Sequence, residues 1–319
     1  SRLETLGKCP LGYFLQYVLK IEPPESMALD EDRWLNSGDA GQLLHSVFRR
    51  CMMEIIPAGR LPEVEHDEAR AIEILDELVT EYKKQIPPPN DAVFNAQYQD
   101  FVATVQTFLR SEAIHCQKTT PLHCEVAIGM PSEDGGTTLD ISEPMQIKLA
   151  GENAIKVRGK IDRIDRIGNP DSQSFALWDY KTGSTYGYKI DDPFKDGRRI
   201  QNALYTHVAE LLLAQQPELN LPTVNQFGYI FPNKKAQGER FVWSRDELND
   251  GKSILDQLCR IAEGGAFLAT NDANDCSFCD YLEVCGSKET IVESSKLKLE
   301  NLDNNVLEPF RKLRCTDDD

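Results

Sequence analysis

The hydrophobic pattern changes its period after the first third of the chain, and this change limits the folds that the chain can adopt. Residues 1–20, 38–56, 65–86 and 91–118 repeat apolar side chains every three or four positions, which predicts helices. From residue 123 to 131 the apolar residues alternate with polar ones, which is typical of a half-buried strand. We therefore expect a helical N-terminal region ahead of a β-sheet.

The rest of the chain mixes strands with helices. Two strand-like segments, 156–168 and 175–183, flank the turn sequence NPDSQS and predict a β-hairpin. Ser244 and Glu247 have the spacing of a capping box, which predicts a last long helix to about Ala262. The other expected elements are a helix at 197–216 and strands at 223–232 and 238–244.

Charge is unevenly distributed along the 319 residues. The net charge of −17 argues against a general polyanion binder. Acidic residues gather in 25–32, in 63–81 and in the TDDD tail, whereas 181–199 is basic and is followed by Lys234, Lys235 and Arg240. The sequence is therefore compatible with a local basic patch on an otherwise acidic protein. No apolar run approaches the length of a membrane span, and the N-terminus has no signal-peptide pattern.

The hairpin carries a candidate catalytic group. Asp179 and Lys181 are two positions apart in a strand, so they share one face. A register that brings Asp162 of the neighbouring strand close would put two carboxylates around one site, where Mg²⁺ or Mn²⁺ offsets their repulsion. Lys181 could then position a water molecule or neutralise charge that develops on phosphorus. The competing interpretation is an exposed hairpin with a weak surface ion pair.

Five motifs in a fixed order resemble the RecB-type branch of the PD-(D/E)XK nuclease superfamily. They are GKIDRID, DYKTG, Gln201-x-x-x-Tyr205, GQLLHSVF and the opening SRLETLGKCPLGYFLQYVLKI, which is similar to the start of the nuclease domain in AddB-like helicase–nucleases. The resemblance runs from Ser1 to about Lys288. It implies an α/β, restriction-endonuclease-like fold, with a mixed central β-sheet flanked by helices and a helical N-terminal region.

The same resemblance implies roles for individual residues. His45, Asp162 and Asp179 would bind the metal ion, together with the backbone carbonyl of Tyr180, and Lys181 would be the catalytic lysine.

Two further positions follow from the helix after the hairpin. Gln201 and Tyr205 are four residues apart, so they share a helix face. By the resemblance this pair lines the active site, where it contacts DNA or orients the lysine. Glu125 resembles a strand acid of some relatives, and we expect little catalytic contribution from it.

The chain has nine cysteines, which is an odd number, and no signal-peptide pattern. We therefore do not expect a disulfide framework. Cys276, Cys279 and Cys285 form a tight cluster whose spacing alone suits zinc, but no fourth ligand stands close in sequence. The family resemblance instead implies a [4Fe–4S] cluster with Cys9 as the fourth ligand. The cysteines expected to be ordinary buried thiols are Cys51, Cys116, Cys124 and Cys259.

Aromatic residues near the hairpin are candidates to stack on bases. They are Trp178, Tyr180, Tyr186 and Tyr188, of which we expect Trp178 to pack in the core.

We expect one nuclease domain over residues 1–290, with a helical part (1–120), a catalytic core (121–245) and a C-terminal helix and cysteine cluster (246–290). Residues 291–319 are expected as a charged tail that frays or lies along the surface. The absence of an initial methionine suggests a domain excised from a longer protein.

The expected activity is Mg²⁺- or Mn²⁺-dependent hydrolysis of DNA, as an exonuclease on single-stranded ends, in the repair or recombination work of an AddB-like helicase–nuclease. Expected partners are DNA and a helicase subunit or region, in the cytoplasm. One alternative is an inactive nuclease-like module that binds DNA or acts as a scaffold, and another is a zinc-binding interaction domain. No P-loop motif is present, so an ATP-driven motor would lie outside the chain.

Overall fold

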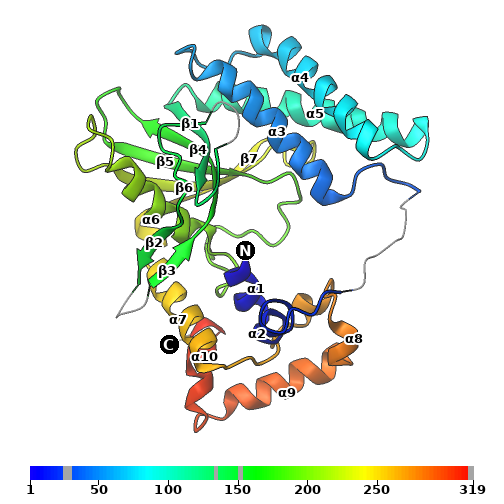
Figure 1. The fold of residues 1–319 in the computed structure, drawn as a ribbon, viewed down its shortest axis with the longest axis vertical. Coiled ribbons are helices and arrows are strands. Elements are labelled where there is room, and N and C mark those ends of the chain that lie inside the picture. Colours follow the sequence, from blue (N-terminus) through cyan, green and yellow to red (C-terminus); the bar gives the residue numbers. More distant parts are fainter. Residues whose placement is uncertain (24–30, 133–135, 150–153, 315–319) are drawn as a thin grey trace.

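A five-stranded sheet in the order β1-β4-β5-β6-β7 forms the centre of the protein (Figure 1). The computed structural model describes residues 1–23, 31–132, 136–149 and 154–314. Neighbouring strands are antiparallel except β5 and β6, which are parallel. The strands of this sheet are β1 (Thr119–Ile128), β4 (Gly159–Ile167), β5 (Ser174–Tyr180), β6 (Thr223–Phe231) and β7 (Glu239–Ser244), and a separate pair joins β2 (Met145–Lys148) to β3 (Ala154–Val157).

Three helices cover one face of the sheet and bury the first of two cores (Figure 1). Phe48 and Phe108 from this layer pack against the ring of Tyr180 on β5. The helices, all expected from the sequence, are α3 (Ser37–Ile55), α4 (Val64–Gln85) and α5 (Asp91–His115). Their apolar side chains recur at helical spacing, so one side of each helix is buried in this core.

The opposite face of the sheet carries the second core. Phe175 and Leu177 belong to this core, whereas Ala176 and Trp178 belong to the first, as the alternation of a strand requires. The helices packed here are α6 (Gln201–Leu213), α7 (Gly251–Gly264) and α10 (Glu308–Arg314). Helices on both faces of a mixed sheet confirm the expected restriction-endonuclease-like fold class.

Segments from the two ends of the chain lie side by side (Figure 1). The N–H group of Leu11 donates to the carbonyl of Leu268 at 3.0 Å, and the hydroxyl of Tyr281 donates to the carbonyl of Ile21 at 2.7 Å. The helices that meet here are α1 (Arg2–Lys8), α2 (Pro10–Tyr13), α8 (Leu282–Cys285) and α9 (Lys288–Glu300). This end of the protein is therefore built from residues more than 250 positions apart in the chain.

The segment expected as a charged, fraying tail is folded through residue 314. It forms most of α9 and all of α10, and Phe310 is fully buried. Apolar residues at helical spacing, among them Leu299 and Leu313, hold the segment against the second core. Cys315 and the TDDD sequence lie outside the described residues, as does most of the acidic stretch 25–32.

Two helix boundaries differ from the sequence prediction. The Ser244–Glu247 capping box forms, with Ser244 N–H donating to Glu247 at 2.7 Å, but it precedes a short 3₁₀ turn, and α7 starts only at Gly251. The helix expected from 197 begins at Gln201, because Lys195, Asp196 and Gly197 all have positive φ angles that no α-helix allows. Among the described residues, no helix has the length and apolar character needed to cross a bilayer.

Candidate active site

The candidate site lies where the paired strands β4 and β5 separate. The hairpin register pairs Arg163 with Trp178 and then ends, so the next residues, Asp162 and Asp179, face the gap. The backbone N–H of Tyr180 donates across this gap to Asp162 Oδ2 at 2.8 Å. Both carboxylates line one hollow of about 330 Å³. The expected hairpin and the approach of its two acids are thus present.

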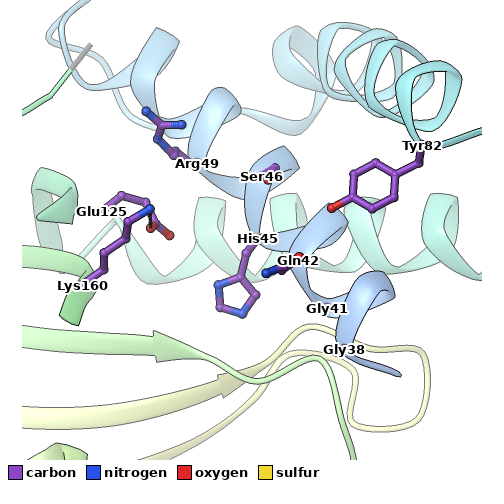
Figure 2. A pocket seen from close by; sticks show the side chains of 9 residues that line it. All are labelled: Gly38, Gly41, Gln42, His45, Ser46, Arg49, Tyr82, Glu125 and Lys160. Carbon is purple, nitrogen blue, oxygen red and sulfur yellow. Dashed lines mark ion pairs between the residues drawn. The ribbon is translucent and has the colours of Figure 1, made fainter. Parts of the chain in front are cut away.

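Three potential metal ligands gather beside this gap. One ligand atom from each of His45, Glu125 and Asp162 lies within 4.8 Å of the others. His45 points from α3 toward the sheet, near Glu125 and Lys160 (Figure 2). Glu125 sits on β1 with a positive φ of 56°, shortly after a bulge in the β1–β4 pairing. A nitrogen and carboxylate oxygens form a donor set that fits a divalent cation.

Lys181 is held by two partners at the opposite side of the same hollow. Its ammonium group lies 2.5 Å from Asp179 Oδ2 and donates to Gln201 Oε1 at 2.9 Å. Gln201 is the first residue of α6. The preceding segment, Lys195–Gly197, has positive φ angles and sets the position of the Gln201 side-chain amide. Asp179 thereby links the lysine to the acid cluster.

Tyr205 follows one turn after Gln201 on α6 and reaches β4. A Cβ atom on Gly159 would lie 2.8 Å from the Tyr205 hydroxyl, so any larger residue there would displace this hydroxyl. Burial raises the pKa of Tyr205 to about 12, and the charges of Asp179 and Asp162 add to the rise. The hydroxyl therefore stays protonated at neutral pH.

Burial and the crowding of like charges shift the pKa values of the site residues. Burial raises the pKa of Asp162 well above its ordinary value of 3.8, and the neighbouring Asp179 and Glu125 charges raise it further. Burial lowers the pKa of His45 below 6.5, which keeps its imidazole neutral at neutral pH. Burial opposes the charge on Lys181, but the adjacent Asp179 carboxylate raises its pKa above 10.5. A cation would offset the repulsion among the acids.

A buried ionic network lies beneath the site. Arg163 is fully buried and donates to Asp165 at 2.6 and 2.8 Å, to the Tyr180 hydroxyl at 3.1 Å, and to Glu112. Glu112 also accepts from Arg240 at 2.9 Å. The network ties α5 to β4, β5 and β7, so it fixes the strands that carry the acids.

Three hollows join along the surface of the site. The first, of about 490 Å³, is lined by Arg49, Lys160 and Tyr82 and shares His45 with the central one (Figure 2). The third, of about 750 Å³, shares Lys181 and Gln201 with the central one. The hollow that holds Asp162 and Asp179 therefore has a neighbouring hollow on each side.

The four cysteines of the predicted cluster come from both ends of the chain. Burial raises the pKa of Cys276, and the charges of Cys9, Cys279 and Cys285 raise it further. Cys9 lies between α1 and α2 and accepts from the Gly12 N–H at 3.4 Å. Of the other thiols, Cys51, Cys116 and Cys124 are buried, whereas Cys259 is only half-buried.

Basic and aromatic residues divide between the interior and the surface. Arg198 and Arg240 are engaged with carboxylates inside the protein, so they do not contribute to the expected basic patch. Trp178 and Tyr180 are buried and pack in the core, as expected for Trp178. Tyr186 is 92% exposed and is available to a ligand.

Two residues matter more in the structure than their sequence patterns indicate. Glu125, from which the sequence predicts little catalytic contribution, offers a ligand atom within 4.8 Å of those of His45 and Asp162. Phe278 lines the hollow beside Lys181, and its place inside the Cys276–Cys279 motif is the only sequence signal that points to it. The structure brings together His45, Asp162, Asp179, Lys181 and Gln201 as expected.

Comparison with known proteins agrees with this geometry. Residues 1–286 match the model of the PD-(D/E)XK nuclease superfamily. A protein of Clostridium novyi (strain NT), described as one subunit of an ATP-dependent helicase/deoxyribonuclease, is 22% identical over 384 aligned residues, which cover 98% of this chain and 32% of that protein. Proteins with the same description from Bacillus mycoides (strain KBAB4) and Bacillus anthracis are 26% identical over 192 residues, 58% of this chain and 15% of theirs. The chain thus spans a third or less of these relatives, and it belongs to the PD-(D/E)XK nuclease superfamily.

Proposed function

We propose that the protein is a metal-dependent DNA nuclease that hydrolyses phosphodiester bonds. The observation that carries this proposal is the grouping of a histidine, two carboxylates and a lysine around one hollow, with Glu125 close to His45 and Asp162. His45, Glu125, Asp162 and Asp179 would hold Mg²⁺ or Mn²⁺, with the Tyr180 carbonyl as a further ligand. When bound, the cation supplies a Lewis acid for a phosphate oxygen and lowers the pKa of a water molecule.

The side chains of the site supply position and charge. Because the pKa of Lys181 is raised, its side chain remains an ammonium group that can donate hydrogen bonds to a water molecule or a phosphate oxygen. Gln201 fixes the direction of this ammonium group through a 2.9 Å hydrogen bond. Lys181 is thus the catalytic lysine of the proposal, and Gln201 is a positioning residue.

The relatives suggest the setting of this activity. Their name joins a helicase to a deoxyribonuclease, and the present chain aligns with a third or less of them. We propose that the chain acts on single-stranded DNA ends as the exonuclease part of such a machine, in cytoplasmic DNA repair, with the motor in another region or subunit. The division into one domain over residues 1–290 and a following segment belongs to this proposal.

The cysteines complete the proposal. Four thiolates are the usual ligand set of a [4Fe–4S] cluster, and we propose Cys9, Cys276, Cys279 and Cys285 as those ligands, because the other three cysteines each raise the pKa of Cys276. Zinc bound by the same sulfurs is the competing assignment.

End-labelled single- and double-stranded DNA with Mg²⁺ or Mn²⁺ tests the activity and its direction. We expect the protein to shorten the single strand. Asp179→Ala and Lys181→Ala should each lower the rate about 100-fold or more, because the first removes a ligand of the proposed cation and the second removes the ammonium group that would stabilise charge on the phosphate. Lys189→Ala, on an exposed lysine nearby, should keep the rate of the unchanged protein.

Equal rates for Lys181→Ala and the unchanged protein would remove this site from consideration. Binding of DNA without any cleavage by the unchanged protein would instead support the inactive DNA-binding module.

A further inference from the structure

The largest hollow beside the candidate active site has no role in the proposed chemistry. It measures about 750 Å³ and meets the site at Lys181 and Gln201. Its walls come from α1, from the loop after β5 and from the cysteine segment near residue 278. We propose that this hollow binds a single DNA strand next to the scissile phosphate, with bases stacked on Tyr186 and Phe278. The inference rests on the proposed nuclease function, since it names how that site holds its substrate.

The two rings are the first observation. Among the described residues, Phe278 and Tyr186 are the most exposed large apolar side chains, at 94% and 92%. They are 92 positions apart in sequence, yet both line this hollow. Their meeting at one hollow beside the acids is therefore a feature of the fold. Exposed aromatic faces along a groove are the usual platform for unpaired bases.

The charges of the hollow are the second observation. Arg198 is neutralised by Asp275 at 2.9 Å and by Asp196 at 2.8 Å. Within the described part of the chain, Lys8, Lys195 and Arg199 line the hollow without a carboxylate partner. Three such cations around one hollow are unusual in a chain whose net charge is −17. Their positive charge can neutralise the phosphates of a DNA strand.

Arg199 shows that the wall is preformed. Its guanidinium lies 3.7 Å from the centre of the Tyr188 ring and donates to the carbonyl of Gly187. This stacking directs the loop that carries Tyr186 along the edge of the hollow. Because a guanidinium held in this way keeps its charge, it can still attract a phosphate.

The geometry favours a single strand over a duplex. The faces of bases inside a duplex are already stacked on one another, so rings on the walls of a hollow can reach only bases that are unpaired and splayed. The strand would pass from the rings to Lys181, where the phosphate meets the acids.

Fluorescence anisotropy with a labelled oligothymidine in EDTA tests this inference without cleavage. We expect Tyr186→Ala and Phe278→Ala each to weaken binding about 5- to 150-fold, because each removes one stacking platform. Tyr186→Phe and Phe278→Tyr keep a ring and should bind like the unchanged protein. Leu302→Ala, at a residue that is 73% exposed and outside the hollow, serves as the matched control.

An abasic oligonucleotide of equal length separates stacking from a general disturbance. It keeps the phosphates but offers no bases, so Phe278→Ala should bind it as tightly as the unchanged protein does. An equal loss on both oligonucleotides, or no loss on oligothymidine, would overturn the inference. Cleavage with Mg²⁺ is measured separately: cleavage without ring-dependent binding sinks this inference alone, whereas ring-dependent binding without cleavage sinks the nuclease proposal.

Discussion

Asp162 is the residue on which the site depends most. It accepts a hydrogen bond from Tyr180, lies 3.5 Å from the His45 ring, and faces the charges of Asp179 and Glu125. In the absence of a cation the folded protein favours its protonated form, since its pKa is raised. Stability from this group is therefore present below pH 3.8 and is lost as the pH rises through the higher folded-state pKa.

The charged Asp162 that would bind a cation also lowers the stability of the cation-free protein. The variant Asp162→Asn tests these two opposing effects. Asparagine copies the neutral carboxyl and can still accept the Tyr180 hydrogen bond, so in EDTA at pH 8 we expect a higher Tm than that of the unchanged protein. Added Mn²⁺ should raise the Tm of the unchanged protein and leave that of the variant unmoved. Differential scanning fluorimetry measures both, with the exposed Asp191→Asn as control. A lower Tm for Asp162→Asn in EDTA would contradict the account.

Arg163 offers a prediction about the support beneath the site. Arg163→Met leaves Glu112 and Asp165 buried without their shared cation, so we expect a loss of about 3–5 kcal/mol in the free energy of unfolding. Arg50→Met removes an exposed arginine that lies 3.4 Å from Glu77, and should cost at most about 1 kcal/mol. Urea denaturation compares the two, and similar losses would show that the network is not a main support.

Asp162 and Glu125 differ in how well their place in the site can be predicted from the sequence. Asp162, Asp179 and Lys181 stand in strand patterns that could be recognised in the sequence. Glu125 lies between Cys124 and Val126, which pair with Arg163 and Ile161 of β4, so the strand register sets it beside Asp162. No local pattern in the HCEVAI sequence encodes that register.

At the scale of elements, close backbone contacts position α1 and α6. Gly7 of α1 packs directly on the carbonyl of Gly197, the residue whose positive φ ends the loop before α6. Sequence periodicity predicts both helices but not the start of α6. The positive φ angles of the residues before α6 depend on tertiary contacts, which periodicity does not reveal. The same contact brings Cys9, at the end of α1, toward the other cysteines.

Gly7→Ala tests this contact. A Cβ atom there would collide with the Gly197 backbone, which cannot rotate away, so we expect a loss of about 1–3 kcal/mol in stability. Gly264→Ala, at a helical glycine with nothing within 4 Å, should be neutral or gain up to about 1 kcal/mol. Thermal and urea unfolding measure the difference. A neutral Gly7→Ala would mean that α1 is free to shift.

At the scale of the molecule, the proposed cluster joins residues 9 and 276 across nearly the whole fold. Such a link restricts the unfolded chain and so favours the folded one. The mixed α/β class could be predicted from periodicity, but the docking of α9 and α10 could not. Their few apolar residues, such as Leu299 and Phe310, have helical spacing, but spacing alone does not show which core they join.

Spectroscopy tests the cluster. Anaerobically purified protein should absorb broadly near ~400 nm, as Cys₄-ligated iron–sulfur clusters do. Cys9→Ser should lose this absorbance and lower the Tm by roughly 4 °C or more, whereas Cys259→Ser should change neither. Colourless protein that holds stoichiometric zinc would refute the iron–sulfur assignment.

The pairing of α1 and α2 with residues 266–314 also bears on how the protein emerges from a ribosome. Residues 2–13 are translated more than 250 residues before their docking partners, which include Leu268 and Arg314. The His45, Asp162 and Asp179 side chains can assemble before then, while the wall that holds Phe278 cannot. A nascent chain would thus carry its acids before its proposed strand-binding surface, so any capture of DNA by that surface would wait until synthesis of the domain is nearly finished.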